Sequence, residues 1–175
     1  PHGWAVFTSN VDGQFQKAGY TQYPVMECHG SLHFLQCATP CGQHIWPADS
    51  FSPNVDADTS RLTNALPVCP HCGGLARPNV LMFNDGQWLE HRAEAQEAAL
   101  RQWLAVPDHG TVLEIGAGTA VATVRAFSNA RQRGGWKVVR INPECHTNVN
   151  PKAVELRMTA GEFFKAISAL EGAQP

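Results

Sequence analysis

Two pairs of cysteines constrain the fold of this 175-residue chain more than any other feature of its sequence. The pairs are Cys37-x3-Cys41 and Cys69-x2-Cys72, and they lie in a stretch rich in Pro, Asp, Ser and Thr that lacks helical or strand periodicity. Such a stretch cannot bury a core of its own, so it needs a crosslink. Close spacing lets both thiolates of a pair face one ion, and two pairs complete the tetrahedron of a structural zinc site.

Two disulfides are the alternative crosslink. The sequence shows no positively charged start followed by an apolar stretch, which a secretory signal would have. We therefore expect a cytoplasmic protein in a reducing compartment, where the thiolates stay free to bind one zinc ion. The predicted ligands are the four paired cysteines, with His44 and His71 as alternative ligands. Cys28 and Cys145 stand apart from the pairs and are expected to be unreactive thiols.

The overall composition is that of an ordinary soluble globular protein, with 43% hydrophobic and 16% charged residues. The formal net charge of −2 supplies no overall positive field for nucleic acid or for an anionic membrane, and no apolar run is long enough to span a bilayer. We therefore expect no direct nucleic-acid partner and no membrane partner. A cluster of basic residues is expected to be a solvated face, and it consists of Arg125, Arg131, Arg133, Lys137 and Arg140.

Short apolar runs predict buried strands at residues 5–8, 80–83, 112–115 and 138–141. Residues 88–104 place apolar side chains near helical spacing, which predicts an amphipathic helix. Thr159, followed three residues later by Glu162, forms a capping-box pattern that predicts the start of a last helix. Strands that alternate with helices favour an α/β fold with a mostly parallel sheet. The cysteine-bearing stretch interrupts this alternation, so residues 35–77 are assigned to an inserted zinc-binding module.

The third predicted strand runs into the glycine turn Gly116-Ala117-Gly118-Thr119, where the backbone can approach a nucleotide closely. This turn also resembles the first motif of S-adenosylmethionine-dependent methyltransferases. In those enzymes the motif opens the fold, and a carboxylate ends the next strand to hold the ribose. Here the motif comes late in the chain and the next strand ends at Asn142, so both observations count against a methyltransferase.

Several segments, in the same order, resemble the sirtuin family. They are Phe7 to Gly19 with its Asn-Val-Asp-Gly run, Glu27-Cys28-His29-Gly30-Ser31, the paired cysteines, Ala76 to Asp85, Gly118-Thr119 and Arg140-Ile141-Asn142. The resemblance covers most of the chain. It implies a Rossmann-like NAD-binding catalytic domain, α/β with helices flanking a mostly parallel sheet, formed by residues 1–34 and 78–175 around the zinc-binding module.

The resemblance also implies an activity, an NAD-dependent protein lysine deacetylase or deacylase. Such an enzyme transfers the acyl group of an acylated-lysine protein or peptide to ADP-ribose and releases nicotinamide. His29 would be the general base, because an unperturbed histidine accepts a proton near neutral pH. Asn10 and Asp12 would share the catalytic site and lie against the nicotinamide and its ribose. A turn rich in Asn, Asp and Gly is the structural alternative for these two residues.

The other site residues follow from the same resemblance. The residues implied on the nicotinamide side of NAD are Ser9, Asn10, Val11 and Asp12. The residues implied on the phosphate and adenosine side are Gly118, Thr119 and Asn142. The residues implied in substrate binding are Leu81, Phe83, Asn84 and Asp85, for which buried strand positions are the structural alternative.

Three departures from the family pattern predict unusual acyl specificity or weak activity. Ser9 replaces a Gln, Asn84-Asp85 replaces Gly-Glu, and Ala120 replaces a Ser. We also expect the family's Gly-Ala-Gly phosphate loop to lie upstream of Pro1, so that these 175 residues alone would bind NAD poorly and be inactive. ADP-ribosyl transfer or NAD hydrolysis on the same fold, and a zinc-stabilised binding module without catalysis, are the remaining alternatives.

Overall fold

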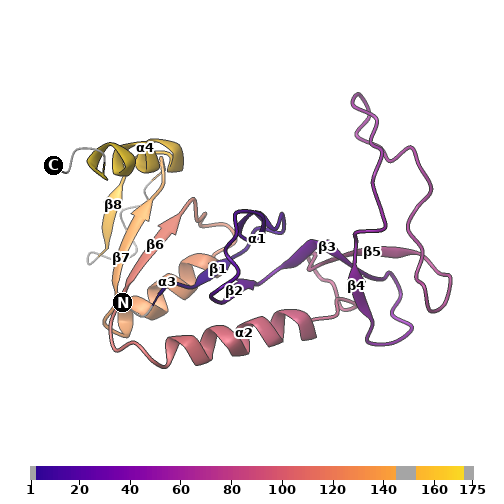
Figure 1. Ribbon diagram of the computed structural model, residues 1–175, viewed down its shortest axis with the longest axis horizontal. Coiled ribbons are helices and arrows are strands. Elements are labelled where there is room, and N and C mark those ends of the chain that lie inside the picture. The colour runs from indigo at the N-terminus through magenta and orange to yellow at the C-terminus, as the bar shows by residue number, and fades with distance from the viewer. Residues whose placement is uncertain (1–2, 145–152, 172–175) are drawn as a thin grey trace. The chain divides into compact units, whose positions relative to one another are not determined.

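The computed structural model describes residues 3–144 and 153–171 (Figure 1). The chain forms two compact units, Pro1–Val106 and Pro107–Pro175. None of the helices in the described ranges combines the length and the apolar character needed to cross a membrane. The prediction of a zinc module at residues 35–77, set into one α/β domain, stays a prediction.

The first unit begins with a parallel pair of short strands. Strand β1 (Val6–Thr8) pairs with β2 (Val25–Glu27), and the register runs from Val6 opposite Val25 to Thr8 opposite Glu27. The short helix α1 (Gln14–Lys17) lies between them in sequence. Helix α2 (His91–Leu104) contacts β2 and buries Ala93 and Leu100, in agreement with the amphipathic helix predicted over 88–104.

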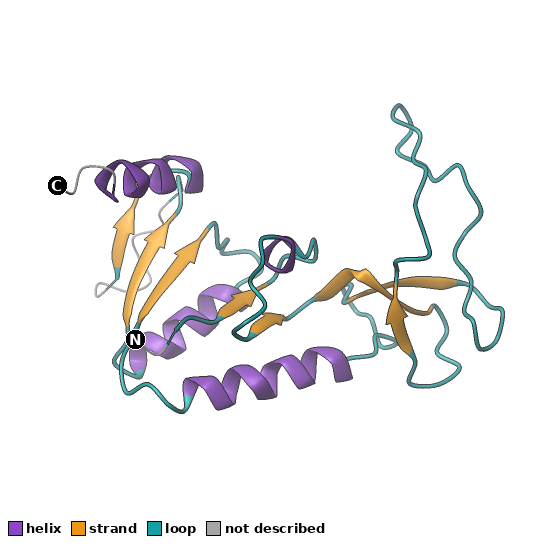
Figure 2. Cartoon of the chain, viewed as in Figure 1, coloured by secondary structure: helices purple, strands orange, loops and turns teal. Residues whose placement is uncertain are grey.

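An antiparallel sheet follows in the same unit, with β3 (Gly30–Cys37) in the centre. Strand β4 (Ile45–Pro47) lies on one side of β3 and β5 (Ala76–Val80) on the other. The chain between β4 and β5 is a long loop, as Figure 2 shows, with isolated bridges pairing Val55 with Leu62 and Val68 with Leu75. The predicted lack of regular elements therefore holds between β4 and β5, whereas β4 itself and the start of β5 lie within the stretch that was predicted to have none.

The strand predicted over residues 80–83 is wrong. Strand β5 ends at Val80, and Leu81, Met82 and Phe83 are exposed, with Phe83 86% exposed. The chain cannot continue straight because Asn84 has a left-handed backbone with φ of 58°. The apolar run therefore forms an exposed loop and not a core strand.

The second unit contains a parallel sheet in the order β6 (Thr111–Ile115), β7 (Lys137–Ile141), β8 (Val154–Leu156). Helix α3 (Thr123–Arg133) connects β6 to β7 and contacts both strands, and α4 (Ala160–Glu171) follows β8. The strands predicted at 112–115 and 138–141 are confirmed. The capping box is also confirmed, because the Thr159 backbone N–H donates to Glu162 at 2.7 Å and the Glu162 N–H donates to Thr159 Oγ1 at 3.2 Å.

The prediction that the basic cluster faces solvent is wrong for two of its members. Arg125 on α3 is 4% exposed and Arg140 on β7 is 1% exposed. The reason is a buried carboxylate, Glu114 on β6, whose Oε1 lies 3.0 Å from Arg140 Nε and 3.6 Å from Arg125 Nη2. A buried charge needs such a partner, and the sequence pattern did not reveal it.

Candidate functional site

Two of the predicted catalytic residues leave the β1–β2 sheet at the same edge. Thr8 at the end of β1 lies opposite Glu27 at the end of β2, so Asn10 and His29 both follow the carboxyl ends of parallel strands. The Cys28 N–H donates to the Thr8 carbonyl at 2.9 Å and keeps the two exits together. The carboxyl edge of parallel strands is where α/β proteins place their ligands.

Asp12 is fixed by contacts on both its side chain and its backbone. Its Oδ1 accepts the N–H of Gln14, the first residue of α1, at 3.2 Å. Its carbonyl oxygen hydrogen-bonds with Lys17 Nζ at 3.1 Å and with His33 Nε2 at 2.9 Å. The predicted turn of Asn, Asp and Gly is therefore present, and it holds the Asp12 side chain in one place.

Ser9 and Val11 complete the segment that was implied on the nicotinamide side. Ser9 is half-buried, and the Val11 carbonyl accepts the Leu32 N–H at 2.8 Å, which ties the segment to β3. All four residues of this segment lie in the first unit, together with His29.

Backbone contacts join His29 to the segment predicted to bind substrate. The Leu81 N–H donates to the His29 carbonyl at 3.0 Å, and Gly30 pairs with Val80 across β3 and β5. Only glycine fits at position 30, because its φ is 80° and a β-carbon there would lie 2.0 Å from the Asn79 carbonyl oxygen. The glycine that follows His29 therefore allows strands β3 and β5 to approach each other this closely.

The segment after β5 presents apolar side chains to solvent. Leu81 is 36% exposed, Met82 60% and Phe83 86%. Asn84 holds a left-handed conformation, which Asn tolerates better than most residues. Met82 was not among the predicted substrate-binding residues, because the resemblance singled out only its neighbours.

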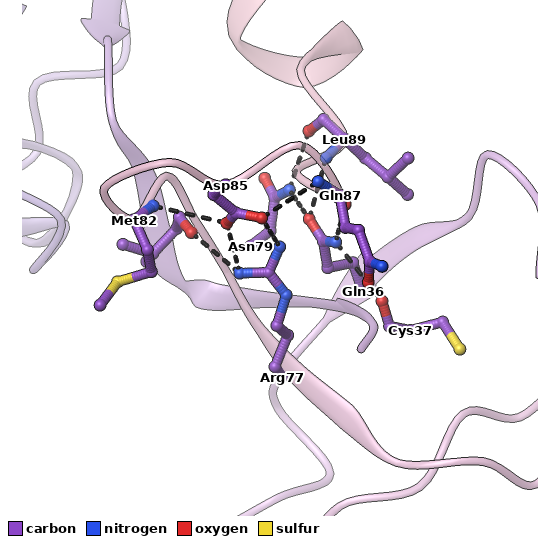
Figure 3. Close-up of polar contacts among 9 residues, drawn as sticks. Gln36, Cys37, Arg77, Asn79, Met82, Asp85, Gln87 and Leu89 are labelled. Carbon is purple, nitrogen blue, oxygen red and sulfur yellow. Dashed lines mark hydrogen bonds and ion pairs between the residues drawn. The ribbon is translucent and has the colours of Figure 1, made fainter. Parts of the chain in front are cut away.

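Asp85 anchors this segment from within. Its carboxylate pairs with Arg77, with Oδ2 2.7 Å from Nη1 and Oδ1 2.9 Å from Nη2, and it accepts the Gln87 N–H at 3.1 Å. Burial alone would raise the pKa of Asp85, but the bonds from Arg77 and from the backbone of Gln87 and Met82 outweigh it and lower the pKa. The Asp85 carboxylate therefore bonds to neighbouring groups of the chain itself, as Figure 3 shows.

A buried pair of amide side chains holds the far end of the same segment (Figure 3). Gln36 on β3 is fully buried, and its Oε1 accepts from Asn79 Nδ2 at 2.8 Å and from the Leu89 N–H at 3.0 Å. Gln36 Nε2 donates to the Gln87 carbonyl at 2.8 Å, and Asn79 Nδ2 donates to the Leu89 carbonyl at 2.9 Å. Sequence reasoning missed both residues. The sequence feature that could have indicated Gln36 is a polar residue in a strand, directly before the paired cysteine Cys37.

The four paired cysteines form one compact group, whose sulfur atoms all lie within 4.8 Å of one another. The Cys37 and Cys72 sulfurs are 3.7 Å apart, and the Cys41 and Cys69 sulfurs are 3.8 Å apart. The thiols are free, so the disulfide alternative is not what the structure contains. A tetrahedron with metal–sulfur bonds of about 2.3 Å has sulfur–sulfur edges of about 3.8 Å, so the spacing fits one ion.

The thiols of this group differ in acidity. Burial opposes ionisation of Cys69, but backbone N–H bonds from His71 and Cys72 and bonds from the neighbouring thiols lower its pKa to about 7. The side-chain bond with Cys72 and then burial raise the pKa of Cys41 to about 12. The group does not include His44 or His71, whose rings stack on each other at 3.7 Å.

The remaining cysteines lie outside this group. Burial raises the pKa of Cys28 to about 11, as expected of an unreactive thiol. Cys145 lies outside the described residues.

In the second unit, the structure brings Asn142 to the glycine turn. Asn142 Nδ2 donates to the Ala117 carbonyl at 3.2 Å, and Gly116, with φ of 67°, donates its N–H to the Ile141 carbonyl at 3.0 Å. Gly118 and Thr119 are exposed at this edge of the sheet. The three residues implied on the phosphate and adenosine side therefore lie within one turn and the end of the adjacent strand.

Comparison with protein families gives a match to the Sir2 family over residues 2–122, which includes the glycine turn. The chain is 30% identical over 169 residues to an NAD-dependent protein deacylase of Aeropyrum pernix, with 96% of this chain and 60% of the relative covered. It is 30% identical over 158 residues to NAD-dependent protein deacylase 1 of Pseudomonas aeruginosa, with 90% and 58% covered. The chain thus spans about three fifths of the length of these curated relatives.

Solved structures show the same fold. A structure of Sir2 with a p53 peptide and NAD+ has a TM-score of 0.64 at 23% identity, covering 98% of this chain and 64% of the other. A structure of a Sir2 protein bound to a propionylated peptide also has a TM-score of 0.64 at 23% identity, covering 97% and 65%. These neighbours confirm the predicted Rossmann-like α/β fold.

Proposed function

Because the chain belongs to the Sir2 family, we propose that its activity is the NAD-dependent removal of acyl groups from protein lysine side chains. The curated relatives are named as deacylases that depend on NAD, and the solved neighbours hold NAD+ or acylated peptides. The observation in this chain that carries the proposal is the bond from the Leu81 N–H to the His29 carbonyl, at 3.0 Å. It sets the candidate base beside the segment proposed to hold the acylated lysine.

His29 is the proposed general base. Its side chain is half-buried, and its backbone is fixed on both sides, by the Cys28 bond to Thr8 and by the Gly30 pairing with Val80. Bound NAD would supply an electrophilic ribose carbon to the acyl oxygen. His29 would then accept a proton from a ribose hydroxyl, which a neutral imidazole does near pH 7.

Asn10 and Asp12 are the proposed partners of the nicotinamide and its ribose, with Ser9 and Val11 beside them. Asn10 is exposed, and its N–H bond to Thr8 Oγ1 at 3.1 Å fixes the backbone from which its amide projects. An amide offers both donors and an acceptor, which suits a carboxamide ligand. In the second unit, Gly118, Thr119 and Asn142 are the proposed contacts of the phosphates and adenosine.

The proposed substrate is an extended peptide that carries an acylated lysine. Leu81 and Phe83 would contact the acyl chain, since both are apolar and exposed and the Leu81 backbone bonds to His29. Asn84 and Asp85 would set the path of the backbone against which the peptide pairs as an added strand. The internal bonds of Asp85 support a role in shaping this path.

Zinc is the proposed metal of the cysteine group, and its role is structural. Four thiolates fill a tetrahedral site and leave no open position for a substrate, which is typical of structural zinc. Free thiols at this spacing also support a reducing, cytoplasmic location.

The deciding experiment uses the protein with the phosphate loop expected upstream of Pro1, and it measures nicotinamide release from NAD with and without an acetylated or propionylated lysine peptide. We expect release only with the acylated peptide, and we expect His29→Ala to slow it by roughly 10²- to 10⁴-fold. His109→Ala, at an exposed position of the second unit, is the control and should leave the rate unchanged. Release without peptide would favour NAD hydrolysis or ADP-ribosyl transfer. Full activity of His29→Ala would contradict the assigned base.

A further inference from the structure

A group of three buried charged side chains lies beside the glycine turn of the second unit. Glu114 on β6 is 3% exposed, Arg125 on α3 is 4% exposed and Arg140 on β7 is 1% exposed. Glu114 Oε1 lies 3.0 Å from Arg140 Nε and 3.6 Å from Arg125 Nη2, and Arg140 also bonds to Asn129. We refer to Glu114, Arg125 and Arg140 as the buried charge cluster.

The cluster is poorly balanced for a purely structural element. Two guanidinium groups face one carboxylate, so one positive charge is in excess in the interior. Several of its buried polar atoms find no hydrogen-bond partner within residues 3–144 and 153–171, namely Arg125 Nε and Nη1, Arg140 Nη1 and Glu114 Oε2. Burying such charges costs free energy that apolar side chains of similar size would not cost. A gain in stability therefore does not explain the cluster.

The contact that distinguishes Arg125 is with the glycine turn. Its Nη2 donates to the Ala117 carbonyl at 2.8 Å, and Asn142 Nδ2 donates to the same oxygen at 3.2 Å. Glu114 in turn holds the Arg125 guanidinium by charge. The Ala117 carbonyl is thus drawn toward the interior of the unit by two donors, one of which is always positively charged.

Fixing this carbonyl also fixes the direction of the next N–H. In a planar trans peptide the C=O and the N–H point in opposite directions, so the Gly118 N–H is directed away from Arg125 and Asn142. Gly118 is exposed, and a β-carbon placed on it would meet no atom within 4 Å among the described residues. A backbone N–H in an open turn before a helix is a donor for phosphate oxygens.

We propose that Arg125, held by Glu114, is a positioning residue that orients the Ala117–Gly118 peptide so that the Gly118 N–H donates to the diphosphate of the cofactor. This inference rests on the proposed function, because it takes NAD as the ligand. Arg125 does not touch the cofactor in this scheme and acts through the turn.

The test compares Arg125→Met with Arg140→Met. Both variants remove one guanidinium from the cluster and keep an apolar stem of similar length, but only Arg125→Met removes a donor from the Ala117 carbonyl. We expect Arg125→Met to weaken binding of ADP-ribose, measured by calorimetry, and to raise KM for NAD by about tenfold, with kcat little changed. Arg140→Met should keep its ADP-ribose affinity within about twofold.

A second readout reports the turn directly and without ligand. The amide resonance of Gly118 in ¹⁵N-labelled protein should shift, and its hydrogen exchange should change, in Arg125→Met but not in Arg140→Met. Arg125→Lys is the variant to use if Arg125→Met does not fold, because it keeps the charge but loses the planar fork that can contact Glu114 and Ala117 together. It should show the same Gly118 shift and an intermediate loss of affinity.

The outcomes separate the two proposals. Equal losses of ADP-ribose affinity in Arg125→Met and Arg140→Met, or an unchanged Gly118 amide in the Arg125 variants, would overturn the positioning role even if NAD-dependent deacylation is observed. Failure of the protein with the phosphate loop expected upstream of Pro1 to bind either NAD or ADP-ribose would overturn the proposed function. The Gly118 amide would still show whether Arg125 orients the turn.

Discussion

Gly30 is the residue at which the candidate base and the candidate substrate segment approach most closely through the backbone. It follows His29 directly and pairs with Val80, and its φ of 80° is one that side chains with a β-carbon rarely adopt. The Asn79 carbonyl occupies the space that such a carbon would need. Glycine is therefore required at position 30 because strands β3 and β5 approach each other closely there, and not because the backbone must be flexible.

We therefore predict that Gly30→Ala destabilises the protein by about 2 kcal/mol or more, because the Asn79 carbonyl must move and the backbone is strained. Urea unfolding measures the loss, and the rate with acylated peptide should fall with it, since the shift displaces Leu81 from His29. The matched control is Gly86→Ala, where a β-carbon meets no atom within 4 Å among the described residues. Equal stability of the two variants would mean that strands β3 and β5 separate at little cost.

At the scale of elements, the loop from Leu81 to Leu89 depends on polar anchors at both ends. Asp85 holds its first part through Arg77, and Gln36 with Asn79 holds its last part. The pKa of Asp85 is held below its ordinary value of about 3.9, so its carboxylate stabilises the fold at any pH above about 4. This contribution is lost as the pH falls through the lowered pKa of the folded state.

Because the folded state lowers the pKa of Asp85, Asp85→Asn should reduce stability at the pH values where the carboxylate is ionised. At pH 7 the variant should unfold at lower urea concentration than the unaltered protein, and the difference should shrink as the pH falls below about 4, where Asp85 itself becomes protonated. The control Asp49→Asn, at an exposed loop position, should show little difference at either pH. If the difference in unfolding urea concentration between Asp85→Asn and the unaltered protein stays constant from pH 7 to pH 3, the ion pair with Arg77 does not act through charge.

Elements built on local patterns could be predicted from the sequence, and those built on distant polar partners could not. The apolar runs at 112–115 and 138–141, the helix within 88–104 and the capping box at Thr159 each depend on residues close in sequence. The bond from Leu89 to Gln36 joins residues 53 positions apart, and no periodicity reveals it. The burial of Arg125 and Arg140 likewise depends on Glu114, a charged residue inside a strand.

The candidate site shows the same division. The spacing of the four cysteines predicted that they form one group, and the structure brings them together. The family resemblance proposed His29 and the Asn10–Asp12 segment, whose sequence neighbours are distinctive. The strand at 80–83 was predicted from an apolar run and is wrong, because the left-handed backbone at Asn84 is a property that an apolar run does not display. Gln36 and Asn79 bond to the end of the candidate substrate segment in the first unit, and their residue types alone predict no such role.

At the scale of the whole chain, the cysteine group links distant parts of the first unit. Cys37 ends β3 and Cys41 follows it, while Cys69 and Cys72 precede β5 across a long loop. Zinc bound by the four thiolates would therefore contribute its binding free energy to ordering this loop. Gln36, adjacent to Cys37, carries the constraint to the substrate segment through its bonds to residues 87 and 89.

Removal of the metal should therefore loosen the first unit and leave the second intact. The unaltered protein should contain one zinc per chain by elemental analysis, Cys72→Ser should lose it, and Cys28→Ser, outside the group, should retain it. After chelation, hydrogen exchange should accelerate across β3, β4, β5 and the loop between β4 and β5, while β6 and β7 keep their protection. KM for the acylated peptide should rise as the Leu81–Leu89 segment loosens. Uniform loss of protection in both units would mean that the metal stabilises the entire chain, and unchanged exchange in the first unit would mean that the cysteine group does not hold it together.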